Sequence, residues 1–105
     1  MPASTDLNSF LESVMNINVL RMGGASAGIL GSTSADSSIV NDLKKSAYLF
    51  ATEYRKSGAD YVTLERLSNE MYGFLQTLQL TYTLSEKEAN KFINQLQKLM
   101  NEASN

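Results

Sequence analysis

Four basic residues stand in two pairs on one stretch of the sequence, Lys44 with Lys45 and Arg55 with Lys56. The two pairs are about three helical turns apart, so an α-helix would bring them back to the same side. Arg66 follows shortly afterwards and can extend the group. Basic side chains in such a row contact the phosphates of nucleic acids. These five residues are therefore the candidate nucleic-acid contacts of the chain.

Two other interpretations of the same residues stay open. Asp42 and Glu53 lie among them, and Glu53 can pair with Lys56 three residues later. The basic residues would then form an ordinary solvated helix face, or a patch for a protein partner. Tyr48 and Tyr61 lie nearby in sequence and could stack on bases or cover lysine stems.

The remaining residue types argue against catalysis. The chain contains no cysteine and no histidine, which excludes Cys- or His-based zinc sites and Ser-His-Asp triads. Gly23 and Gly28 have the spacing of a phosphate-binding loop, but Ile29 stands where that loop needs lysine. The acidic residues are scattered, and no calcium-loop pattern occurs. We predict a protein that is not an enzyme, with no metal, no cofactor and no small-molecule substrate.

The length of 105 residues is that of one domain, here 1–105, and the net charge of −2 gives no global attraction to nucleic acid. No run of apolar residues is long enough to span a membrane, and the N-terminal residues lack the pattern of a secretory signal. Together with the absence of cysteine, this predicts a cytoplasmic protein that does not bind membranes.

Apolar residues recur at spacings of three and four along four segments, near residues 6–22, 38–57, 64–79 and 85–103. The only proline is Pro2, so nothing breaks these segments internally. Short connections join the last three segments, which makes them antiparallel neighbours. We predict an all-α, four-helix antiparallel bundle-like domain with a flexible Gly/Ser-rich linker over residues 23–37.

Several positions mark the helix ends. Thr63 can cap the third helix, Ser85 and Glu88 fit a capping box before the fourth, and Gly58 suits a left-handed stop. Gly73 lies inside the third helix, either for close approach of another helix or as a tolerated surface glycine. Residues 80–84 break the helical pattern and are β-branched and aromatic enough for a short extended piece.

The first predicted helix is apolar over more than one side, and it carries few charged residues. Either it lies at the centre of the fold, or its second side meets a partner. The candidate protein-interaction residues are the apolar ones of this second side and of the linker: Leu11, Met15, Val19, Leu20, Met22, Ile29 and Leu30.

Residues 47–58, AYLFATEYRKSG, followed after a short turn by residues 63–72, TLERLSNEMY, resemble the small all-helical subunits of CRISPR effector complexes. The resemblance covers about a quarter of the chain and implies a non-enzymatic bundle that lines a guide–target channel with basic residues. The slightly acidic net charge departs from that pattern.

The leading functional prediction is a non-enzymatic helical protein–protein interaction module, either a small subunit of a larger assembly or a small regulatory binding protein. Its partner would be another protein or copies of itself, in an oligomer. The alternative is an accessory small subunit that contacts nucleic acid, for example in a CRISPR-type ribonucleoprotein complex.

Overall fold

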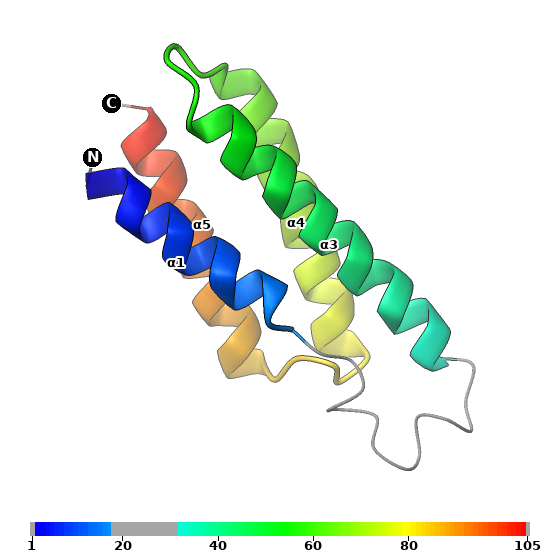
Figure 1. The fold of residues 1–105 in the computed structure, drawn as a ribbon. Helices are drawn as coiled ribbons and strands as arrows, with labels where there is room; N and C mark the ends of the chain where they lie inside the picture. The colour runs from blue at the N-terminus through cyan, green and yellow to red at the C-terminus, as the bar shows by residue number, and fades with distance from the viewer. Residues whose placement is uncertain (1, 18–31, 105) are drawn as a thin grey trace.

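The computed structural model describes residues 2–17 and 32–104, with side chains over residues 5–17 and 37–104. In these residues the chain forms helices α1 (Pro2–Met15), α3 (Ser32–Tyr54), α4 (Tyr61–Leu80) and α5 (Glu86–Ala103), and no strand (Figure 1). The predicted all-α, four-helix bundle-like fold is confirmed.

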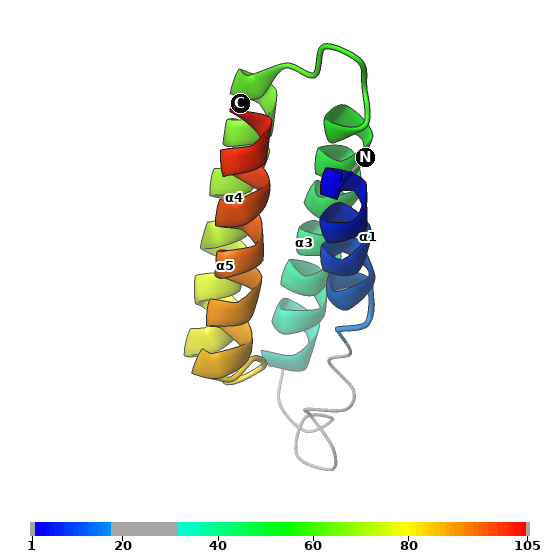
Figure 2. The same ribbon diagram turned by 90° about the vertical axis from the view of Figure 1, so that its left-hand side faces the viewer.

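Each helix runs antiparallel to its two neighbours. Helix α1 packs against α3 and α5, and α4 packs against the same two helices from the other side (Figures 1 and 2). The turn between α4 and α5 lies at the end of the bundle where α1 finishes and α3 begins. The two helical hairpins of the chain, α3–α4 and α4–α5, have short connections, as the sequence predicted.

The core consists of the apolar stripes of all four helices. The rings of Phe10 and Phe92 meet edge to face across α1 and α5, with centroids 6.4 Å apart, a favoured aromatic geometry. Phe50 and Met71 bring α3 and α4 into the same core with no exposed surface. The largest fully buried side chains are Phe10, Phe50, Leu7, Leu43, Leu64, Met71, Leu75, Leu78, Leu96 and Leu99.

Helix α1 begins and ends earlier than the predicted span of residues 6–22. Pro2 is accommodated because a proline in the first helical turn loses no intrahelical hydrogen bond. At the other end, the amide of Asn16 still donates to the Glu12 carbonyl (3.0 Å), but that of Ile17 donates to Val14 (3.1 Å). This change to a three-residue spacing tightens and closes the helix. The predicted continuation over residues 18–22 lies outside the described residues.

Helix α3 begins at Ser32, within the span of 23–37 predicted as a linker. Residues 32–37 read STSADS and contain neither glycine nor proline. Serine, threonine and aspartate lower helix propensity only modestly, so a continuing helix can include them. The rest of the predicted linker, residues 23–31, lies outside the described residues.

Helix α4 starts at Tyr61 because Asp60, and not the predicted Thr63, is its N-cap. The Asp60 carboxylate accepts from the backbone amide of Thr63 (3.1 Å), which satisfies a first-turn donor. The capping box of α5 is confirmed: the Ser85 hydroxyl accepts from the Glu88 amide and the Glu88 carboxylate from the Ser85 amide, both at 3.1 Å. Residues 80–84 form the end of α4 and a turn, and not the short extended segment that their β-branched and aromatic residues suggested.

Candidate interaction surfaces

The turn between α4 and α5 presents two large apolar side chains to solvent. Leu80 is 79% exposed and Tyr82 is 82% exposed, with Thr81 between them. These three residues are named the turn tip. Other large apolar side chains are also exposed, but less so: Met15, Tyr48, Leu49, Tyr61 and Val62. Adjacent exposed apolar side chains are a common mark of a surface that contacts another molecule.

Backbone hydrogen bonds hold the turn tip in one conformation. The amide of Tyr82 donates to the Gln79 carbonyl (3.0 Å), and the amide of Thr83 donates to the Leu78 carbonyl (2.9 Å). With Thr81 as C-cap, these are the two bonds of a Schellman motif, in which the residue after the cap adopts a left-handed conformation. Tyr82 occupies that position, with φ of 64°.

A tyrosine in this conformation destabilises the fold. The left-handed region brings Cβ close to the carbonyl oxygen that follows, at a cost of roughly 1–2 kcal/mol for a residue other than glycine. Elsewhere the chain uses glycine for the same purpose, since Gly58 after α3 has φ of 76°. Among the described residues, Tyr82 is the non-glycine residue with positive φ. Its exposed ring gains little packing in return.

The residues around the turn tip are anchored in the bundle. The Thr81 hydroxyl contacts the Leu78 carbonyl (3.2 Å) and the Thr83 hydroxyl (3.1 Å), and both Thr83 and Leu84 are buried. The capping box of Ser85 and Glu88 then starts α5 directly. Leu80 and Tyr82 therefore project from a well-determined support, and binding would require little ordering of the backbone.

The predicted interaction residues of the first helix are only partly described. Leu11 is half-buried and packs against the core, whereas Met15 is 38% exposed at the end of α1. Val19, Leu20, Met22, Ile29 and Leu30 lie outside the described residues. Within its described length α1 has one buried side and one largely polar exposed side, and it lies at the periphery between α3 and α5, not at the centre of the fold.

The predicted basic group is divided between different partners. The Arg55 guanidinium donates to the Asn8 side chain on α1 (2.6 Å), and Lys56 pairs with Glu53 (3.0 Å). Arg66 on α4 pairs with Glu70 (3.1 Å). Surface pairs of this kind contribute about 0–1 kcal/mol and partly neutralise the cations.

The two remaining basic residues, Lys44 and Lys45, lie earlier in the sequence, within α3. Lys44 is half-buried and Lys45 is exposed. Glu70 also faces α3, because the Ser46 hydroxyl lies 3.4 Å from its carboxylate. Acidic side chains are thus interleaved with the predicted phosphate contacts. Nucleic-acid binding by Lys44, Lys45, Arg55, Lys56 and Arg66 stays a prediction.

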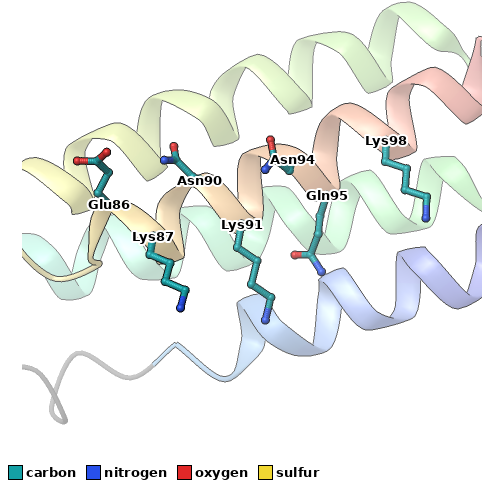
Figure 3. A pocket seen from close by; sticks show the side chains of 7 residues that line it. All are labelled: Glu86, Lys87, Asn90, Lys91, Asn94, Gln95 and Lys98. Atoms are coloured by element: carbon teal, nitrogen blue, oxygen red, sulfur yellow. The ribbon is translucent and has the colours of Figure 1, made fainter.

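A second basic row, which the sequence analysis did not single out, lies on the outer side of α5. Lys87, Lys91 and Lys98 come at spacings of four and seven residues, which places them on one side of the helix (Figure 3). These three residues are named the α5 lysine row. The sequence signal for this row is the helical spacing of four and seven residues, without any two basic residues being adjacent.

The α5 lysine row borders a shallow, open hollow rather than a pocket. The hollow is formed by side chains of α5 alone, which are Glu86, Lys87, Asn90, Lys91, Asn94, Gln95 and Lys98. A second recess of about 230 Å³ lies between α1 and α5 and includes Ser13, Ile17 and Leu84. It is smaller than the ~300–1,000 Å³ typical of small-molecule sites.

The perturbed pKa values of the described residues belong to structural contacts. The backbone amide of Asp60 and then Lys56 lower the pKa of Glu53, and hydrogen bonds from Thr63 lower the pKa of Asp60. Burial raises the pKa of the Tyr54 hydroxyl, with smaller contributions from Glu102 and Asp6. Each shift follows from a helix end or a packing contact and none lies at the turn tip.

Comparisons with protein-family models, with curated proteins and with solved structures found no match to this chain. Among the described helices, none has both the length and the apolar character that crossing a membrane requires. In the same part of the chain, acidic side chains form no group of three or more that could hold a metal ion.

Proposed function

We propose that this chain is a small, non-enzymatic helical module that binds another protein through the turn tip of Leu80, Thr81 and Tyr82. The observation that supports it most is Tyr82, an exposed aromatic residue in a backbone conformation that favours glycine. A residue that lowers stability without contributing packing is a good candidate for a functional role.

The chemistry of the turn tip fits a protein partner. Tyrosine is enriched among the residues that dominate binding energy at interfaces, where its ring fills a pocket and its hydroxyl forms a hydrogen bond. Leu80, two residues earlier, adds a second apolar anchor. The nearest charged side chains along the chain, Glu86 and Lys87, have opposite signs, so the tip carries no strong electrostatic preference. We expect a partner with an apolar pocket.

The non-enzymatic part of the proposal rests on residue types and on shape. The sequence has no cysteine or histidine to serve as nucleophile or base near neutral pH. The recess between α1 and α5 is small, and the hollow on α5 is open. We also propose a cytoplasmic location, which the absence of cysteine supports.

Affinity capture with the full chain tests this proposal. Wild type, Tyr82→Asn and Tyr48→Ser are compared as baits in extracts of the native cell, with quantitative mass spectrometry. Tyr48 is the matched control, because it is an exposed tyrosine on the outer side of α3. We expect the Tyr82→Asn bait to capture at least about tenfold less of the main partner than wild type does. This is the effect of losing a binding contribution of ~1.4 kcal/mol. Tyr48→Ser should retain it.

The stability of the variants separates loss of contact from loss of fold. Asparagine tolerates the left-handed conformation, so Tyr82→Asn should melt at the same temperature as wild type or higher. Purified wild type is also examined by light scattering. Association that Tyr82→Asn abolishes would identify the partner as a second copy of the chain. Identical capture profiles for all three baits would disprove the proposal.

A further inference from the structure

Three exposed lysines lie along the outer side of α5. Lys98 follows Lys87 by eleven positions, about 16 Å of helix, and Asn94 occupies the place between Lys91 and Lys98. In Figure 3 the side chains of Lys87, Lys91 and Gln95 extend toward α1, and that of Lys98 extends to the same side. All three lysines are exposed, and Lys91 also lines the recess between α1 and α5.

Carboxylates lie beside this row toward both of its ends: Glu88 lines the same recess as Lys91, and Glu102 follows Lys98 by four residues. Residues 89–101 of α5 include Lys91 and Lys98 but no acidic residue. At the first turn, Glu86 is exposed and Glu88 is engaged in the capping box. At the far end, Asp6 of α1 lies 3.2 Å from the Lys98 ammonium, whose side chain remains 64% exposed. An exposed pair of this kind contributes little and is readily exchanged for another anion.

The same side of α5 is polar throughout. None of the large exposed apolar residues among the described side chains lies on α5. The exposed residues between and beside the lysines are Asn90, Asn94, Gln97 and Asn101, which donate and accept hydrogen bonds. Protein interfaces have apolar or aromatic anchors at their centre, and this surface has none. Lysine, asparagine and glutamine are residues that contact phosphate oxygens.

We infer that the outer side of α5, through the α5 lysine row and its asparagines, binds the phosphate backbone of nucleic acid. No aromatic residue is present on this side of α5 to stack on bases, so the contact is independent of base sequence. This inference does not rest on the proposed function, because it uses a different surface. A chain with both surfaces would hold a protein at the turn tip and a nucleic acid along α5.

Fluorescence anisotropy with the full chain tests this inference. The probes are a labelled single strand and a labelled duplex of about 20 nucleotides, at low salt, where backbone contacts are strongest. The test variant is Lys87→Gln/Lys91→Gln, which leaves the Lys98–Asp6 pair intact. The matched control is Asn69→Asp/Gln76→Glu, two exposed positions of α4 outside both basic groups, with the same change in net charge.

We expect the α5 variant to bind at least about tenfold more weakly, whereas the control stays within about twofold. The dependence of the logarithm of affinity on the logarithm of salt concentration should become shallower by about 1.8 for duplex, or 1.4 for a single strand, when two lysines are lost. Both forms of nucleic acid share the phosphate chemistry, and the relative affinities show which form is preferred.

Three outcomes would overturn the inference. The first is no binding to either probe at low salt, and the second is an equal loss of affinity in the α5 variant and the α4 control. The third is displacement of the probe by polyglutamate as effectively as by unlabelled nucleic acid. The last outcome would assign the row to acidic protein. Circular dichroism of both variants checks that they remain helical, and we expect no loss, since exposed surface substitutions seldom alter stability by more than about 0.5 kcal/mol.

Discussion

The hydroxyl of Tyr54, at the end of α3, lies 3.2 Å from the backbone carbonyl oxygen of Leu99 on α5 and donates a hydrogen bond to it. These two helices are not neighbours around the bundle, so the bond crosses it diagonally. The ring of Tyr54 also packs against Phe50, with centroids 5.7 Å apart. Tyr54 therefore joins α3 directly to α5 at the end of the bundle opposite the turn tip.

Replacing Tyr54 with phenylalanine should lower the free energy of unfolding by about 1 kcal/mol, the usual contribution of one such hydrogen bond. Urea denaturation at neutral pH measures the change. The control is Tyr48→Phe, because Tyr48 is an exposed tyrosine.

Burial raises the pKa of Tyr54. A raised pKa means stability that is present at neutral pH and is lost as the pH rises through that value. The difference between wild type and Tyr54→Phe should therefore shrink in alkali; an unchanged difference would argue against a buried hydroxyl.

Gly58 provides an independent measure of the cost assigned to Tyr82. An added Cβ at Gly58 would meet no atom within 4 Å, so Gly58→Ala changes only the backbone preference. With φ of 76°, the variant should be less stable by about 1 kcal/mol in chemical denaturation. Tyr82→Gly should act in the opposite direction, although glycine also increases the entropy of the unfolded chain. If Gly58→Ala leaves stability unchanged, the argument for strain at Tyr82 fails.

Gly73 lies in the middle of α4 and is exposed, with open space where a Cβ would stand. The described part of the chain therefore offers no helix that approaches it closely, which favours the interpretation of a tolerated surface glycine. Gly73→Ala should raise the free energy of unfolding by roughly 0.5–1 kcal/mol, because alanine restricts the unfolded chain and favours helix. A thermal melt would show this as a higher midpoint. A lower midpoint would indicate a steric conflict that the structure does not contain.

The loop between α3 and α4 should make the stability of the fold depend on pH in the acidic range. The carboxylate of Glu53 accepts from the Asp60 amide (2.8 Å), and its pKa lies below the ordinary value of 4.5. A lowered pKa means stability that is present above the ordinary value and is lost as the pH falls through the lowered one. Wild type should therefore have a higher melting midpoint than Glu53→Gln at neutral pH, and the two midpoints should converge as the pH falls below the ordinary value of 4.5. Midpoints that keep a constant separation would exclude this contribution.

The fold was predictable because its determinants are local and periodic. Leu7, Phe10, Val14 and Ile17 follow helical spacing, and all four are buried. The capping box at Ser85 and Glu88 was equally visible, since it depends on two residue types three positions apart. Helix ends were less predictable: Asp60 takes the cap expected of Thr63, because either residue type can serve and only the chain path selects one.

The turn tip could not be found from sequence for a physical reason. Left-handed positions after helices are recognised by glycine or asparagine, and Tyr82 is neither. Its β-propensity suggested an extended piece instead. The partner of Arg55 was also beyond sequence analysis, because Arg55 reaches a residue on another helix. The Arg66–Glu70 pair, in contrast, has the i,i+4 spacing that can be read from the sequence.

The Schellman turn at Tyr82 also bears on how this sequence can change over generations. A lineage that no longer meets the partner gains stability when position 82 becomes glycine or asparagine, so drift there should favour these two residues. A lineage that keeps the partner must retain an aromatic side chain at position 82, although glycine or asparagine there would make the fold more stable. The residue found at this single position in related chains would then record which of them still make the contact.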